Sequence, residues 1–130
     1  MAIKVAGNTV INDNKVFLPN STAEVSASAS ISSGVLTLDL NTATAFAVSL
    51  TSNITSLVLQ NVQSSGRTSS FVIIFTADGN TRAVSWPSSF KWPGGVAPTI
   101  TATLNKIDVY TFFTTDGGST WQAFISGQNL

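Results

Sequence analysis

The sequence contains no histidine and no cysteine, and these two absences remove most of the usual chemistry of protein sites. Without cysteine there is no disulfide framework, no zinc-binding thiolate and no thiol nucleophile. Without histidine, the many serine and threonine hydroxyls lack the imidazole that commonly activates such a nucleophile. We therefore expect that the protein is not an enzyme and requires no cofactor.

Charged side chains are also scarce. They make up 9% of the 130 residues, six basic and six acidic, whereas soluble domains typically carry about 25%. No cluster of Lys and Arg exists to neutralise phosphates, so we expect no binding to nucleic acid. A surface built mainly of Ser, Thr, Asn and Gln suits a protein partly covered by copies of itself or by a larger assembly. The alternative is a monomer with a hydroxyl-rich surface.

The acidic residues are isolated from one another in the sequence, and most lie at expected turns or on polar strand faces. They are Asp13, Glu24, Asp39, Asp78, Asp108 and Asp116. A tertiary pairing, for example of Asp78 with Asp116, stays open, although turn roles are favoured. Asp78-Gly79-Asn80 is only a fragment of a cation-binding loop, and an Asx turn explains it as well. We predict no metal site.

Long apolar runs are absent as well. The longest, Phe71 to Phe75, is far too short to span a bilayer. The start, Met1 to Val5, has no long apolar run after its charge, so we expect no signal peptide. These features predict a soluble protein made in the cytoplasm, with no membrane partner.

What the sequence does contain is β-strand patterning. From Gly34 onward apolar and polar residues alternate, as in Leu36, Leu38 and Leu40. The continuous apolar run Phe71–Phe75 is expected for a strand buried on both sides. Further strands are expected near residues 84–86, 100–104, 109–113 and 121–125. Turn residues recur about every ten positions, which predicts an all-β, antiparallel β-sandwich or jelly roll.

The first 33 residues have a different character. Two short strands are expected, at residues 5–10 and 15–18, and a Ser/Ala-rich stretch follows them. That stretch is either a linker or an ordinary edge strand. We therefore divide the chain into an extended N-terminal arm and linker, 1–33, and a β-sandwich domain, 34–130. Because two strands alone are marginally stable in water, the arm needs a partner. The arm residues expected to bind one are Val10, Ile11, Val16, Phe17 and Leu18.

Two loops carry local motifs. Trp86-Pro87 and Trp92-Pro93 cannot form strand ladders. Their rings either stack on a sugar in an exposed loop or, the interpretation we favour, cover one end of the domain. The segment after residue 113 resembles the Asp-box of sialidases and other β-propellers, which is structural rather than catalytic. Its matching residues are Thr114, Asp116, Gly118, Thr120 and Trp121. One such motif in a chain too short for a propeller predicts a hairpin only.

A composite of these motifs carries a wider resemblance. Trp86-Pro87, Lys91 to Gly95, Pro98-Thr99-Ile100, Asp108-Val109-Tyr110, Thr114 to Gly118 and Thr120-Trp121 stand in that order. Over residues 35–130 the chain resembles a module found in virion structural proteins of tailed bacteriophages, particularly those of cyanobacteria and marine bacteria. The resemblance implies a virion component, usually trimeric, held by its N-terminal part. It brings no catalytic residues.

Within a virion, a chain with only an arm and one domain suits a head decoration, or cement, protein. The partner would then be the major capsid protein or another virion protein, and the chain would form a homotrimer. Binding to the assembled shell alone would stabilise that shell. The alternative is a tail-fibre tip that recognises host carbohydrate, with Trp86 and Trp92 as the exposed ligand contacts.

Overall fold

The computed structural model of the chain describes residues 3–5, 8–11 and 24–130. Within these residues the protein is all-β, and a single 3-10 turn is its one helical element. The bounds are Ile3–Val5 (β1), Asn8–Ile11 (β2), Ser26–Ser28 (β3), Ile31–Ser32 (β4), Val35–Asp39 (β5), Ala45–Leu50 (β6), Ser56–Gln60 (β7), Ser69–Ala77 (β8), Phe90–Lys91 (β9), Pro93–Gly95 (η1), Ile107–Thr114 (β10) and Trp121–Gly127 (β11).

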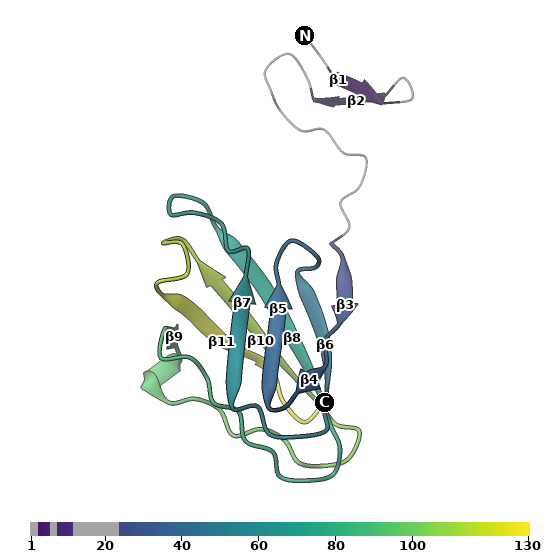
Figure 1. Cartoon of the computed structure of the whole chain (residues 1–130), viewed down its shortest axis with the longest axis vertical. Coiled ribbons are helices and arrows are strands. Elements are labelled where there is room, and N and C mark those ends of the chain that lie inside the picture. Colours follow the sequence, from purple (N-terminus) through teal and green to yellow (C-terminus); the bar gives the residue numbers. More distant parts are fainter. Residues whose placement is uncertain (1–2, 6–7, 12–23) are drawn as a thin grey trace.

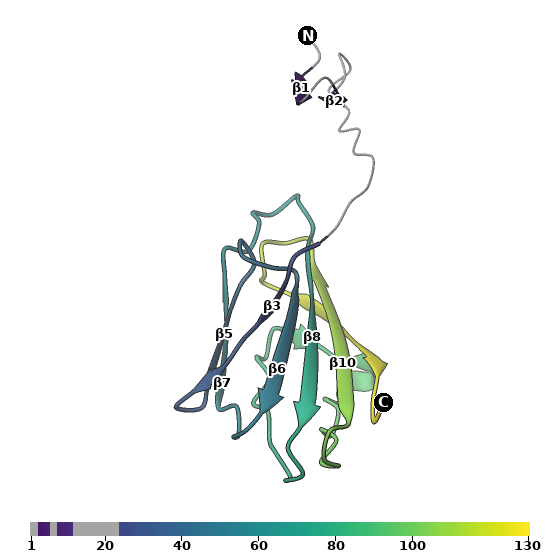
Figure 2. The same ribbon diagram turned by 90° about the vertical axis from the view of Figure 1, so that its right-hand side faces the viewer.

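The strands belong to three sheets (Figure 1). β1 and β2 form a two-stranded antiparallel sheet of their own. The larger sheet has the strand order β3-β6-β8-β10-β11-β9, and the smaller sheet has the order β4-β5-β7. These two sheets lie face to face as two layers (Figure 2), and their apolar side chains form one core.

Both layers are mixed rather than antiparallel. β8, β10 and β11 pair antiparallel, as the sequence predicts, but β3, β6 and β8 run parallel to one another, and β5 runs parallel to β7. The reason is the connectivity: the chain passes from β5 in the smaller sheet to β6 in the larger, back to β7, and then to β8. Strands joined by such a crossover point the same way, whereas a hairpin would reverse them. The expected antiparallel arrangement therefore holds only for β8, β10 and β11 of the larger sheet and for the β4–β5 pair of the smaller one.

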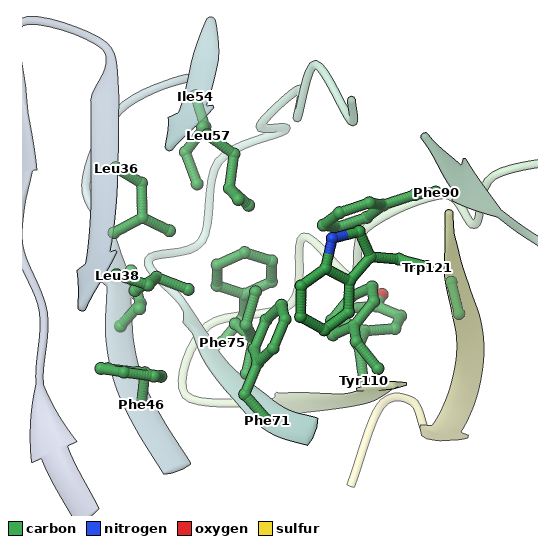
Figure 3. Close-up of a cluster of buried hydrophobic side chains, with 14 of the residues drawn as sticks. Leu36, Leu38, Phe46, Ile54, Leu57, Phe71, Phe75, Phe90, Tyr110 and Trp121 are labelled. Atoms are coloured by element: carbon green, nitrogen blue, oxygen red, sulfur yellow. The ribbon is translucent and has the colours of Figure 1, made fainter. Parts of the chain in front are cut away.

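The alternation found in the sequence puts one side chain in two into the core. Leu36 and Leu38 on β5 are fully buried, and they lie beside Leu57 and Leu59 in the parallel register of β7. On β8 the inward residues are Phe71, Ile73 and Phe75, each at most 1% exposed. Leu36, Leu38, Leu57, Phe71 and Phe75 meet between the layers (Figure 3).

The Ser/Ala-rich stretch belongs to the folded body. β3 pairs with β6 and β4 pairs with β5, so residues 26–32 form edge strands of the two sheets, and the predicted boundary between 33 and 34 lies inside the domain. Small alternating side chains suit this place because Ala27, Ala29 and Ile31 pack against the core.

Two expected strands are largely absent. In the region of residues 84–86 there is only an isolated bridge between Ile54 and Val84, and residues 100–104 are irregular. Proline interrupts this region at positions 87, 93 and 98, and the N–H of Thr101 bonds to a side chain instead of a ladder partner. Within the described residues no helix is long and apolar enough to cross a membrane.

Candidate functional site

The acidic side chains do not converge on a common site. Asp78 pairs with Arg82, and hydrogen bonding from this guanidinium lowers the pKa of Asp78 to about 2. Asp39 accepts hydrogen bonds from the Asn61 side chain and from the Asn41 N–H, and these hold its pKa below the usual range. No group of three metal-ligating side chains occurs in the part of the chain that the structure describes. Asp13 lies outside that part.

One acid is buried, and the sequence did not single it out. Asp108, 1% exposed, lies on β10 and points inward. Its Oδ2 accepts bonds from the Thr101 N–H at 2.8 Å and the Tyr110 hydroxyl at 2.9 Å, and its Oδ1 accepts one from the Asn129 N–H at 3.0 Å. Gln128 completes the network by donating from Nε2 to the Tyr110 hydroxyl oxygen at 2.9 Å.

The network explains the state of both titratable groups. Burial of Asp108 acts to raise its pKa, but the hydrogen bonds from Thr101, Asn129 and Tyr110 outweigh burial and hold the pKa below the ordinary value. Burial also raises the pKa of Tyr110, and the neighbouring Asp108 adds to that shift. The Asp108 carboxylate, charged at neutral pH, and its donors Thr101, Tyr110 and Asn129 form a hydrogen-bonded clamp that joins β10 to the segments at residues 101 and 129. The sequence offers one signal for this contact: Asp108 and Tyr110 are two residues apart, and this spacing puts both side chains on the same face of a strand.

The Asp-box residues form a tight hairpin between β10 and β11. Asp116 Oδ1 accepts from the Thr114 hydroxyl at 2.8 Å and from the Thr120 N–H at 2.9 Å, and these bonds lower its pKa. Gly118 has a φ of +88° and donates its N–H to Thr114 Oγ1 at 3.2 Å. Trp121, 2% exposed, then turns back into the core. Every one of these side chains is occupied in holding the turn or filling the core.

The Trp-Pro loop likewise covers the core. The Trp92 ring is 7% exposed and Trp86 is partly buried. Their ring centroids lie 5.0 Å apart in an edge-on arrangement, and both rings contact Tyr110, at 5.5 and 5.7 Å. Trp92 is thus buried in the core, as the covering interpretation expects, and Trp86 packs partly against it.

A shallow groove of about 210 Å³ lies where this loop meets the hairpin and the edge of the smaller sheet. It is lined by Leu59 and Val62 from the β7 side, by Pro87 and Phe90 from the loop, and by Gly118 of the hairpin. Ligand pockets for drug-sized molecules usually have 300 to 1,000 Å³, and they offer a few convergent polar groups. This groove is smaller than such pockets.

The arm residues are only partly within the described chain. Val10 and Ile11 lie in β2, which pairs with β1 in the register Ile3 opposite Ile11. Val16, Phe17 and Leu18 lie outside the described residues.

Comparison with protein-family models, with curated proteins and with solved structures finds no match. Function therefore has to be argued from the chain itself.

Proposed function

We propose that this chain is a non-catalytic structural protein of a tailed-phage virion, a decoration (cement) protein that binds the outer surface of the assembled head and stabilises it. It is made in the host cytoplasm and acts as a homotrimer on the major capsid protein. Its body, residues 24–130, is a β-sandwich, and its N-terminal hairpin is the attachment arm.

The observation that carries the proposal is the hairpin β1–β2, which pairs with neither of the other two sheets among the described residues. A lone two-stranded sheet is marginally stable in water. A partner surface that adds to an edge of this hairpin would supply the missing main-chain hydrogen bonds, as in other cases of strand addition. The resemblance over residues 35–130 and the 9% charge content support the same assignment.

The body supports a structural rather than a catalytic role. Each of the acids Asp39, Asp78, Asp108 and Asp116 is engaged in local hydrogen bonds or an ion pair, and Glu24 accepts one from the Thr44 hydroxyl at 2.6 Å. A cement protein needs a folded body and a binding surface, and no free catalytic group. It works by mass action, because a protein that binds only the assembled shell shifts the equilibrium toward that shell.

The test is imaging of virions by electron cryo-microscopy, with the full chain, without it, and with a variant lacking residues 1–18. We expect density for the full chain on the head, and loss of that density for the truncated variant, which still folds because both large sheets lie within residues 24–130. Val96→Ser, at an exposed loop position, is the control and should attach normally.

Other outcomes contradict the proposal in distinguishable ways. Density at the tail tip would favour the alternative, a tip that recognises host carbohydrate. Attachment of the truncated variant to the head would show that the β-body, not the arm, binds the partner.

A further inference from the structure

The outer face of the larger sheet is more apolar than the surface of a solitary sheet should be. On β8, Val72 and Ile74 alternate with the buried core residues and point away from the core, and both are only partly covered. An antiparallel or mixed sheet with one face in water normally carries polar residues there. The continuous apolar run of β8 predicted burial on both sides, and a single chain provides cover on one.

The apolar character extends across four strands. Six residues define what we call the outer face: Ala47 (β6), Val72 and Ile74 (β8), Val109 and Phe113 (β10), and Phe124 (β11). The register places Ile74 between Ala47 and Val109, at the middle of the face. Phe113 and Phe124 stack with ring centroids 5.9 Å apart and planes 10° apart, and Phe124 is 45% exposed.

No outward position of β6, β8, β10 or β11 carries a charge, because the one charged residue of these strands, Asp108, points inward. The smaller sheet differs. Its outward positions include Thr37, Asp39, Ser56 and Gln60. Val58 is exposed on that side as well, so it is the absence of charge that distinguishes the larger sheet.

The size of the outer face fits an interface between copies. Four strands spaced about 4.8 Å apart and about eight residues long cover roughly 500 Å². Two such faces together bury on the order of 1,000 Å², the size at which an interface becomes specific. Polar side chains lie between the apolar ones on this face, namely Ser49, Ser70, Thr76, Thr111, Gln122 and Ser126. Such a mixture of apolar and uncharged polar groups is usual in protein interfaces.

We propose that the outer face binds the same face of a second copy of this chain. The absence of charge favours a second copy as the partner. A charged partner would lose the hydration of its charged groups on binding, and this face offers no opposite charge to offset that cost. A second copy presents an uncharged surface of the same size. The inference goes beyond the proposed function: a face that binds the same face of a second copy forms a twofold contact, whereas the contacts within the proposed homotrimer join different surfaces. Its test uses the isolated full-length chain, so it can fail or succeed independently of any virion.

The experiment measures molar mass by sedimentation velocity across a dilution series. We expect the wild-type chain to exceed its monomer mass of 13.6 kDa, and Ile74→Lys to weaken association about a hundredfold, because like charges would face each other across the interface. Thr37→Lys places the same charge on the exposed outer side of the smaller sheet and should leave association unchanged.

A charge-swap pair makes the test specific. Mixing Ile74→Lys with Ile74→Glu should restore association that neither variant shows alone. If Ile74→Lys fails to fold, as judged by circular dichroism, Phe124→Lys at its half-exposed site replaces it. A monomeric wild-type chain, an Ile74→Lys variant that associates normally, or equal weakening by Thr37→Lys would each overturn the proposal.

Discussion

The core has two halves that are closed in different ways (Figure 3). In the leucine half, strands β5 and β7 cover the larger sheet with Leu36, Leu38 and Leu57. In the aromatic half, which lies over β10 and β11, the smaller sheet has no further strand. There the loop between β8 and β10 supplies Trp86, the short strand β9 with Phe90, and Trp92.

The difference shows what a strand contributes beyond its side chains. β5 and β7 are held by a five-pair ladder, whereas β9 has two ladder pairs, to Trp121 and Gln122. The aromatic half must therefore obtain its order from ring packing, with Phe90 and Phe112 centroids 4.7 Å apart, and from the three prolines that restrict the loop. We expect it to be more sensitive to the loss of single side chains.

The largest effect is expected for Phe71→Ala, since this ring lies where the two halves meet. It stacks on Phe112 at 4.7 Å and meets Trp121 edge-on at 5.1 Å. Truncating a buried Phe typically lowers the free energy of unfolding by about 3–5 kcal/mol. The measurement is urea denaturation followed by tryptophan fluorescence and by far-UV circular dichroism.

The two probes also test whether the halves are separate units. All three tryptophans lie in the aromatic half, so fluorescence reports on that half while circular dichroism reports on both sheets. We expect coincident transitions. Transitions that separate would show two independent cores. The control Val96→Ala, at a site 72% exposed, should change stability by no more than about 0.5 kcal/mol.

An intermediate effect is expected for Asp108→Asn, which breaks the clamp at the border of the aromatic half. The amide cannot accept from Thr101, Tyr110 and Asn129 as a carboxylate does, and a loss of about 1–3 kcal/mol follows at neutral pH. The pKa of Asp108 is lowered in the folded state. Its contribution is therefore present above the unfolded-state pKa and is lost as the pH falls through the folded-state value.

The pH dependence distinguishes this role from simple packing. When the pH falls from neutral to below 4, the wild-type chain should lose more stability than the Asp108→Asn variant. The other carboxyl groups whose pKa is lowered contribute equally to both proteins. Equal losses would mean that the carboxylate charge is not what the network stabilises. The measurement is the midpoint of urea unfolding at a series of pH values.

The sequence predicted which face of each main strand is buried better than it predicted which strands pair with one another. Alternation placed Leu36 and Leu38 in the core correctly, because a period of two is a local property. The continuous run Phe71–Phe75 predicted burial on both sides, but Val72 and Ile74 are only partly buried. The parallel pairing of β6 with β8 depends on a crossover through the other layer, and no local pattern encodes that. The buried role of Asp108 was likewise out of reach, since its partners Thr101 and Asn129 lie in separate segments.

The smallest effect is expected for Gly118→Ala in the hairpin that closes the aromatic half. With φ at +88°, an alanine here adopts a left-handed conformation at a cost of about 1–2 kcal/mol. Its Cβ would also lie 3.3 Å from Trp121 Nε1 and 3.3 Å from Val62 Cγ1. Gly66→Ala is the matched control: φ is +87° and nothing lies within 4 Å of the added Cβ. Because the two sites share the backbone cost, any larger loss of stability at Gly118 measures crowding against the Trp121 ring and Val62. Equal losses would show that this ring yields to the added methyl group, and that the aromatic half is less tightly packed than the ring distances imply.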